Sequence, residues 1–347
     1  MLQKRQAKID TCAWPTKLVQ AKQHVMHIFL KFADAMTQTL FYNPSEVPID
    51  RRLVITQGTF DGIHLGHKEV LQHLVSLAKE KNTRSLLLTF HPHPRLVIEP
   101  NNSELQMLSS IQEKSAAVFA LGVDYILVLP FTQEFSQKSP REFVSDVLVN
   151  QLHVDTIVIG YDHRFGKNRS GGFEDLLVLA KEFQFTVHEI PASVVYEIAI
   201  SSSRIRKALQ NKQLKEANEL LGRPYAITGT VVEGKHIGRS IGFPTANILI
   251  DDPYKLIPPN GVYAGTCTIQ HKTYKMMCNI GVRPTFKGSI RTIEAHILNF
   301  DNSIYSETIQ LHLVQYLRNE QEFDSIESLK SQLVLDAKQA QILVSLP

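Results

Sequence analysis

The pattern of apolar residues changes once along this 347-residue chain, close to Gly222, and this change limits the folds that it can adopt. Before Gly222, short apolar runs alternate with segments that carry helix signals. Such runs are typical of buried parallel strands, and strand–helix alternation builds a doubly wound α/β sheet. We expect strands at 53–56, 85–90, 125–129, 156–159 and 185–190.

Two helix starts are marked in this first region. Ser110 with Glu113, and Ser139 with Glu142, both fit a capping box, in which each side chain bonds the backbone N–H of the other. Pro140 follows the second serine at the first helical position, where its missing N–H costs nothing. We therefore expect helices to begin after both serines.

Beyond Gly222, glycine, proline and β-branched residues dominate. Apolar residues spaced three and four apart return only from Asp324 to Leu343, which predicts one final helix. The second region therefore predicts an antiparallel β-barrel or sandwich closed by a C-terminal helix. Strand-like runs lie near 226–233, 245–250, 261–270, 292–299 and 308–317. The expected domains are residues 36–222 and 223–347.

The formal net charge of +3 is concentrated at the start of the chain. Residues 1–35 hold six basic and two acidic side chains, so the remainder is close to neutral. The pI of about 8.6 therefore describes this segment, which we expect to be a dispensable appendage, and gives no reason to expect a nucleic-acid partner.

No run of about 18 apolar residues is present, so we expect no membrane-spanning helix. Three widely separated cysteines, Cys12, Cys267 and Cys278, form no disulfide framework, and no signal or transit peptide is recognisable. These features predict a cytoplasmic protein.

The most informative segment is Gly58–His67, GTFDGIHLGH, between the first strand and the first helix. A helix N-terminus offers free N–H groups and a partial positive charge to phosphate. His64 and His67 are three residues apart, so both rings face one side and can stabilise charge on phosphoryl oxygens. The alternative is a glycine-rich turn with two incidental histidines. Walker A and GxGxxG patterns are absent, which disfavours P-loop and dinucleotide-binding folds.

The segment Ser201–Arg206 precedes a helix pattern. Its serines can cap that helix while Arg204 or Arg206 reaches a phosphate. A plain capping run with surface arginines is an equally good interpretation of these residues alone.

Two loops follow strands at the carboxyl edge of the expected sheet, where ligands bind in open α/β folds. They are His91–Pro94 and Gly160–Gly166. His91 and His93 could ligate a metal, but no cysteine or carboxylate stands at zinc-site spacing nearby. A rigid loop beside a nucleotide is the favoured interpretation.

Taken together, GxFDGxHxGH, the distal SSSRIR, TFHPHP at 89–94 and GYDHRFG at 160–166 resemble the adenylyltransferase half of the bacterial bifunctional riboflavin kinase/FMN adenylyltransferases. Ser203 replaces the more usual threonine and keeps the hydroxyl. The resemblance implies that His64 and His67 are catalytic. It also implies ATP-phosphate contacts from Gly58, Phe60, Asp61, Gly66, Ser202, Ser203, Arg204 and Arg206, and an adenosine and flavin pocket formed by His91, Pro92, Asp162, Arg164 and Phe165.

In the second region, a glycine-punctuated loop runs from Gly234 to Asn247. Thr245 and Asn247 alternate at a strand start and so point to one side, and their hydroxyl and amide oxygens are hard ligands suited to Mg²⁺. A β-turn with a polar strand end is the alternative. Glu294 alternates with apolar neighbours, so it is either a solvent-facing residue or a base aimed into a cleft.

The set PTAN, GVYA, NIGVRPTF, EAH, RNE and FD resembles the riboflavin kinase domain of the same family, a small β-barrel with a C-terminal helix. The resemblance implies Mg²⁺ at Thr245 and Asn247, and Glu294 activating the riboflavin 5′-hydroxyl. It further implies ATP binding by Gly234, Lys235, Gly242, Pro244 and Thr245, and flavin binding by Asn279, Arg283 and Arg318. Two family glycines are replaced, one by Met276 or Met277 and one by Ser306.

The expected function is therefore two-step flavin synthesis, with riboflavin, FMN and ATP as small-molecule partners, Mg²⁺ in both steps, and ADP, FAD and pyrophosphate as products. We expect no nucleic-acid or membrane partner. Two alternatives are a nucleotidyltransferase for another phosphate acceptor and a flavin carrier without catalysis. The carrier predicts damage to the chemical residues, yet all are intact: His64, His67, Thr245, Asn247 and Glu294.

Overall fold

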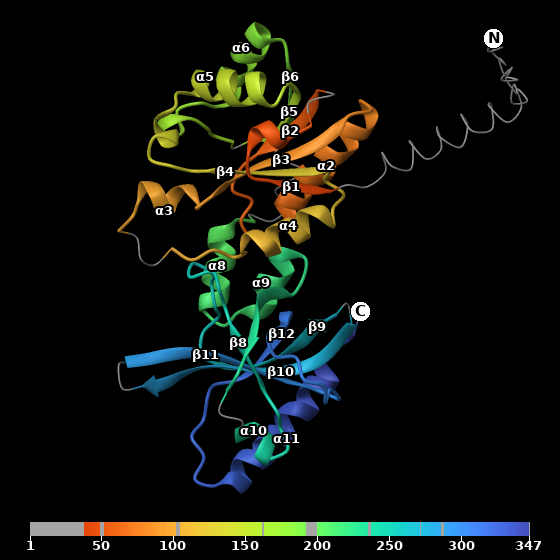
Figure 1. The fold of residues 1–347 in the computed structure, drawn as a ribbon, viewed down its shortest axis with the longest axis vertical. Helices are drawn as coiled ribbons and strands as arrows, with labels where there is room; N and C mark the ends of the chain where they lie inside the picture. The colour runs from red at the N-terminus through yellow and green to blue at the C-terminus, as the bar shows by residue number, and fades with distance from the viewer. Residues whose placement is uncertain are drawn as a thin grey trace, which may run out of the picture. The chain divides into compact units, whose positions relative to one another are not determined.

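The computed structural model describes residues 38–48, 52–101, 105–161, 163–191, 200–234, 237–270, 272–285 and 288–346 (Figure 1). The predicted appendage, 1–35, lies outside these residues, as do Asp162 and Lys235. The N-terminal region (38–222) and the barrel region (223–346) belong to one compact unit, apart from the first two described residues.

The N-terminal region is built on one six-stranded sheet with the order β1-β4-β3-β2-β5-β6. The pairs β2–β3, β3–β4, β2–β5 and β5–β6 are parallel, which confirms the predicted doubly wound sheet. All five expected strands are present. The strands are β1 (Thr39–Phe41), β2 (Leu53–Gln57), β3 (Arg84–His91), β4 (Tyr125–Pro130), β5 (Val154–Gly160) and β6 (Thr186–Ile190).

Apolar clusters cover both faces of this sheet because its strands are buried on both sides. Ile55 of β2 packs in a cluster with α6, whereas its neighbour Val54 packs in another with α2. Both predicted capping boxes are present, at Ser110 and Ser139. The helices are α2 (Leu65–Glu80), α3 (Pro94–Ile98), α4 (Ile111–Phe119), α5 (Pro140–Glu142) continuing as a π-helix (Phe143–Gln151), and α6 (Phe173–Phe183), with 3-10 turns at Pro44–Glu46, Phe135–Gln137 and Lys167–Arg169.

The strand order reverses between β2 and β5, because β3 and β4 lie to one side of β2 and β5 and β6 to the other. Ligands of open α/β sheets bind outside the carboxyl ends of the strands at such a switch point. The segments Gly58–His67 and Gly160–Gly166 follow these two strands directly, so the topology brings them to this edge.

Two helices, α8 (Ser202–Gln210) and α9 (Leu214–Leu221), lead into a closed barrel with the order β10-β11-β8-β7-β12-β9. Its neighbours pair antiparallel, and a final helix, α11 (Ile326–Leu343), packs on the outside through Ala340 against Ala264 and Met277. The predicted barrel with a closing helix is confirmed. Its strands are β7 (Tyr225–Val232), β8 (Ala246–Leu249), β9 (Gly261–Ile269), β10 (Lys272–Thr285), β11 (Gly288–Ile297) and β12 (Thr308–Arg318).

The structure differs from the sequence-based expectation at two places in the barrel. Strand β10 was not predicted, and a short helix, α10 (Ile237–Ser240), lies within the expected glycine loop. Met276 and Met277 of β10 are both buried, Met276 in the barrel core and Met277 beneath α11. Ser306 has φ +63, the left-handed region that favours glycine, which accounts for glycine as the usual residue there.

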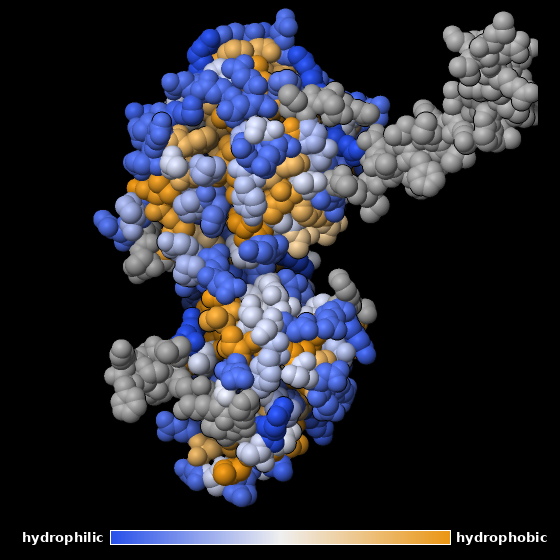
Figure 2. All heavy atoms as spheres, viewed as in Figure 1, coloured by the Kyte–Doolittle hydropathy of each residue, from blue (hydrophilic) through white to orange (hydrophobic). Residues whose placement is uncertain are grey.

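None of the helices in the described ranges is long and apolar enough to cross a membrane. On the face shown in Figure 2, hydrophobic side chains form separate patches among hydrophilic ones.

Candidate functional site

The first candidate site is built at the start of α2. His64 is the N-cap of this helix, and its Nδ1 accepts a hydrogen bond from the backbone N–H of His67 at 3.3 Å. The two rings stack with centroids 3.6 Å apart, and the Phe60 ring lies 4.8 Å from that of His67. The capping geometry thus places both imidazoles on one side of the helix start, as the spacing predicted.

Both histidines are uncharged near neutral pH. Burial lowers the pKa of His64 to about 4 and holds the pKa of His67 well below its ordinary value. Within the described part of the chain, Nδ1 of His67 is buried and has no hydrogen-bond partner. These rings can therefore exchange hydrogen bonds with a ligand.

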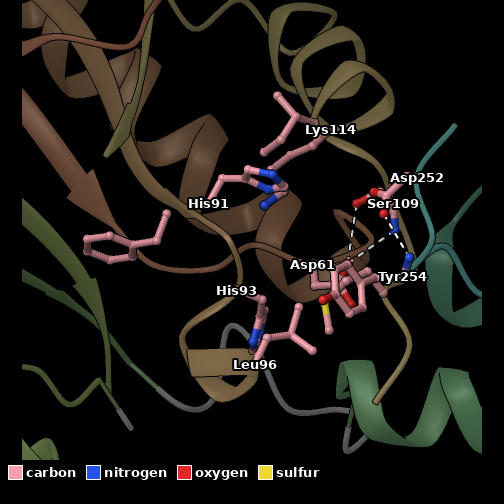
Figure 3. A pocket seen from close by; sticks show the side chains of 11 residues that line it. Asp61, His91, His93, Leu96, Ser109, Lys114, Asp252 and Tyr254 are labelled. Atoms are coloured by element: carbon pink, nitrogen blue, oxygen red, sulfur yellow. Dashed lines mark hydrogen bonds between the residues drawn. The ribbon is translucent and has the colours of Figure 1, made fainter. Parts of the chain in front are cut away.

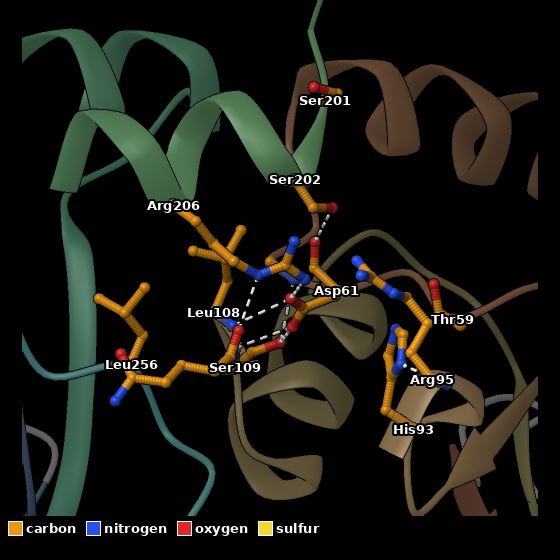
Figure 4. Close-up of polar contacts among 12 residues, drawn as sticks. Thr59, Asp61, His93, Arg95, Leu108, Ser109, Ser201, Ser202, Arg206 and Leu256 are labelled. Carbon is orange, nitrogen blue, oxygen red and sulfur yellow. Dashed lines mark hydrogen bonds and ion pairs between the residues drawn. The ribbon is translucent and has the colours of Figure 1, made fainter. Parts of the chain in front are cut away.

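Asp61 organises the loop that leads to these histidines (Figure 4). Its side chain is 2 % exposed and accepts hydrogen bonds from the backbone N–H groups of Leu108 and Ser109 at 3.0 and 3.1 Å. Arg206 of α8 forms an ion pair with it at 2.7 Å, and the Ser202 hydroxyl donates to its backbone carbonyl at 2.9 Å. The distal serine–arginine segment is thereby joined to the first loop.

The remaining residues that were predicted to bind phosphate differ in their burial and in their partners. Gly58 has φ +158 and Gly66 is buried within α2. Ser203 is exposed in the first turn of α8. Arg204 pairs with Glu216 of α9 at 2.8 Å, whereas the second bond of Arg206 goes to the carbonyl of Gln106.

A small pocket lies beside Asp61 (Figure 3). It is lined by His91, His93 and Lys114 from the N-terminal region and by Asp252 and Tyr254 from the barrel region. Lys114 of α4 donates to the carbonyl of Thr59 at 2.7 Å, and burial lowers its pKa to about 8. We did not predict Lys114 from the sequence. The available signal was its position four residues before the fully buried Val118, on the inward face of α4.

The loop after β5 has one predicted residue in the core and one at the surface. Phe165 is 6 % exposed and packs near Phe143, with ring centroids 6.1 Å apart. Arg164 is exposed, and its guanidinium lies against Gly172. Of the residues predicted to form the adenosine and flavin pocket, His91 lines the observed pocket, Pro92 follows it directly, and Asp162 lies outside the described residues.

The second candidate site is a row of side chains across three barrel strands. Asn279 of β10 lies directly opposite Glu294 of β11, which lies directly opposite Asn247 of β8. Directly opposed residues of antiparallel strands point to the same face. The flanking Ile293 and Ala295 belong to the barrel core, so the row lies on the outer face and Glu294 is half-buried there.

Gly234, the first residue of the glycine loop, lies against one end of this row. A Cβ on Gly234 would lie 2.0 Å from Nδ2 of Asn247, and one on Gly238 would lie 2.2 Å from the carbonyl of Phe243 and 3.5 Å from the Thr245 hydroxyl. Only glycine permits so close an approach. Asn247 and Glu294 lie opposite one another, and Thr245 stands two residues before Asn247 in the chain. The oxygen atoms of these side chains are hard donors, which suit Mg²⁺.

The described residues hold no group of three or more His, Cys, Asp or Glu that could bind a metal by itself. Mg²⁺ commonly keeps several waters and shares substrate phosphates, so a site with one carboxylate fits it.

The other predicted residues of the second region are distributed around the row. Gly242 is exposed with φ +87, and the carbonyl of Pro244 accepts a bond from Nδ1 of His296 at 2.8 Å. Asn279 donates to Glu320 at 3.3 Å. Arg318 is held by Asp336 of α11 at 2.7 Å, the Arg283 side chain is not described, and Lys235 lies outside the described residues.

Comparisons with known proteins agree with this two-site arrangement. The FAD synthetase family model matches residues 46–204 and the riboflavin kinase family model matches residues 221–344. Bifunctional riboflavin kinase/FMN adenylyltransferases from Listeria monocytogenes and Escherichia coli K12 are 39% and 35% identical, covering 83% and 85% of this chain and 91% and 93% of theirs.

One solved structure, a Streptococcus pneumoniae protein described as a macrolide-efflux protein, is 30% identical with a TM-score of 0.78. It is matched over 87% of this chain and 98% of its own. That likeness extends over both regions described above. With two family models in tandem and relatives matched over nearly their whole length, the chain belongs to the family of bifunctional riboflavin kinase/FMN adenylyltransferases.

Proposed function

We propose that this chain performs both reactions of its family. Riboflavin is phosphorylated by ATP to FMN, and FMN is then adenylylated by a second ATP to FAD with release of pyrophosphate. The observation that carries this proposal is the presence of two chemically different sites, a neutral histidine pair capping α2 and a carboxylate row on the barrel. We assign adenylylation to residues 36–222 and phosphorylation to residues 223–347, and place the protein in the cytoplasm.

Adenylylation needs no general base, because the attacking FMN phosphate is already an anion. Its difficulty is the repulsion between that phosphate and the α-phosphate of ATP. The N-terminus of α2 offers backbone N–H groups and a partial positive charge, and each neutral imidazole keeps one N–H donor. We propose that His64 and His67 use these donors to stabilise charge on the transferring phosphoryl group.

The second anion-binding element is the start of α8. Ser202 ties it to the Asp61 carbonyl, and Ser203 presents an exposed hydroxyl in the first turn. We propose that these serines and Arg206 hold the triphosphate. Asp61 is hydrogen-bonded to Arg206, Leu108 and Ser109, and we propose that its role is to organise the loop.

Phosphorylation requires a base, since an alcohol is a poor nucleophile at neutral pH. We propose that Glu294 accepts the proton of the riboflavin 5′-hydroxyl as the bond from that oxygen to the γ-phosphorus forms and the bond from the γ-phosphorus to the leaving ADP oxygen breaks. Thr245 and Asn247 would hold Mg²⁺, which when bound neutralises charge on the ATP phosphates. The glycine loop would cover the nucleotide, and Asn279, next to Glu294 in the row, would orient the flavin.

The flavin contacts of Arg283 and Arg318 stay predictions. Arg318 is engaged with Asp336, so its contribution would come from fixing the end of β12 against α11. Both substrate sets are small molecules: riboflavin, FMN and ATP.

The test is incubation of the protein with riboflavin, ATP and Mg²⁺, followed by chromatography with flavin fluorescence. FMN should appear first and FAD after it. Unchanged riboflavin would contradict the proposal. Conversion of supplied FMN to FAD with no phosphorylation of riboflavin would favour a nucleotidyltransferase that does not make its own acceptor. Tight binding of riboflavin without conversion would favour a flavin carrier.

A further inference from the structure

A short segment of the N-terminal region, Met107–Ser109, forms hydrogen bonds with the barrel region. The N–H of Met107 donates to the carbonyl of Tyr254 at 2.6 Å, and its carbonyl accepts from the N–H of Leu256 at 2.8 Å. Met107 and Lys255 therefore pair like neighbours in a parallel sheet. Lys255 lies within the residues matched by the riboflavin kinase model, whereas Met107 lies within those matched by the FAD synthetase model.

Lys255 fixes this contact with its side chain. It is 3 % exposed, and its Nζ lies 2.5 Å from a carboxylate oxygen of Glu113. The same ammonium donates to the carbonyls of Leu108 and Ala226, each at 2.7 Å. An ammonium has three donors, so all of them are used. Both carboxylate oxygens of Glu113 are also hydrogen-bonded, because the second oxygen accepts from the N–H of Thr228 at 2.7 Å.

The opposite side of the same segment holds the loop of the histidine site. The carbonyl of Leu108 accepts a hydrogen bond from Lys255. The backbone N–H groups of Leu108 and Ser109 donate to Asp61 (Figure 4). The Ser109 hydroxyl also accepts from the N–H of Gly62 at 3.1 Å. Lys255 is therefore connected to Asp61 and Gly62 by hydrogen bonds that pass through Leu108 and Ser109. Asp61 and Gly62 directly precede Ile63 and His64.

We propose that Lys255, although it belongs to the kinase half, is a positioning residue for adenylyl transfer. It holds Leu108 so that the N–H groups of residues 108 and 109 point at Asp61, and Asp61 in turn sets the loop that ends in His64. This inference rests on the proposed function of the histidine site. Displacement of a catalytic group by about 1 Å can cost about 10²-fold in rate, so loss of this bracing should lower adenylylation strongly.

A single Lys255→Met change would leave the buried Glu113 charge unpaired and destabilise the protein. The informative variant is therefore Glu113→Gln with Lys255→Met. Glutamine removes the charge and keeps one carbonyl oxygen, which can accept from the backbone N–H of either Ser110 or Thr228. Lys275→Met is the matched control, because Nζ of Lys275 also donates to a carbonyl, that of Gln341, elsewhere on the barrel.

For each variant, kcat and KM are measured for FMN adenylylation and for riboflavin phosphorylation on one preparation. We expect the double variant to lose about 10- to 100-fold in kcat for adenylylation, with phosphorylation within about twofold of the unsubstituted protein. The Lys275→Met control should change neither rate. Normal adenylylation in the double variant, or an equal fall in both reactions, would overturn the proposal.

A second measurement distinguishes a positioning role of Lys255 from a general loss of structural stability. If Lys255 acts through Asp61, the double change should lower adenylylation less in an Asp61→Asn background than in the unsubstituted one. If the double change and Asp61→Asn lowered adenylylation in a strictly additive way, action of Lys255 through Asp61 would be contradicted. Failure of the unsubstituted protein to form FAD would instead contradict the proposed function, and this inference with it.

Discussion

The two candidate sites differ in their surroundings and in the chemical groups that they contain. The histidine site is enclosed, and its titratable rings are kept neutral by burial. The barrel site lies on an outer face, and its central group is the half-buried carboxylate of Glu294 between two asparagines. An anionic acceptor needs charge stabilisation and no base, whereas an alcohol needs a base. Under the function proposed for each site, the chemistry of the acceptor accounts for the groups that the site contains.

The largest expected effect comes from Glu294→Gln. The amide keeps the size of the side chain but cannot accept the hydroxyl proton, so phosphorylation of riboflavin should fall by about 10²- to 10⁴-fold. Conversion of supplied FMN to FAD should continue. Both rates are measured by chromatography of flavins, and a parallel loss of the two would break the division of labour.

The reciprocal change is His64→Asn. Asparagine is a good N-cap, so α2 should remain capped while the imidazole donor is lost. Adenylylation should fall by about 10²- to 10³-fold, and phosphorylation should be unaffected. Retention of adenylylation would show that His64 is only a helix cap.

Burial of His64 also has a stability consequence. Its pKa is about 4 in the folded protein against 6.5 unfolded, so the unfolded chain binds the proton first as pH falls. The associated stability is complete above pH 6.5 and is lost as pH falls toward 4. Between pH 7 and 5 the unfolding free energy should fall by about 2 kcal/mol more in the unsubstituted protein than in His64→Asn. Urea unfolding at the two pH values measures this difference, and equal falls would contradict it.

A smaller effect is expected from Gly234→Ala. The added Cβ would lie 2.0 Å from Nδ2 of Asn247, so the amide must move. Phosphorylation should fall about tenfold with adenylylation unchanged, because only the barrel site is displaced. A wild-type phosphorylation rate would show that Asn247 does not need its observed position.

The smallest effect is expected from Arg204→Ala. Arg204 is exposed and pairs with Glu216, and exposed ion pairs contribute about 0–1 kcal/mol. Adenylylation should therefore change by less than about fivefold. A loss of about 100-fold would instead support the triphosphate contact that the sequence motif suggested for this residue.

Local patterns predicted most of the fold. Strands of the first region and both capping boxes were recognisable because their signals lie within a few residues. Strand β10 was missed because Gly281 and Pro284 interrupt its apolar pattern. The strand forms nonetheless, since it pairs with β9 from Lys272 to Ile280 and with β11 from Met276 to Thr285.

Among the site residues, too, local relations were predictable from the sequence and contacts between distant residues were not. His64 and His67 were predictable because their relation is a matter of helix geometry. The partners of Asp61 and Lys255 were not, because Arg206 and Glu113 lie 145 and 142 residues away along the chain, and sequence spacing says nothing about such pairings. Phe165 packs in the core, and its place in the adenosine and flavin pocket stays a prediction.

The central claim is that each half of the chain holds one complete chemical step. It is tested most directly by the ratio of FMN adenylylation to riboflavin phosphorylation, measured for Glu294→Gln and His64→Asn beside the unsubstituted protein. We predict that the ratio rises at least about 10²-fold in Glu294→Gln and falls at least about 10²-fold in His64→Asn. A ratio that stays at the unsubstituted value in both variants would contradict the account.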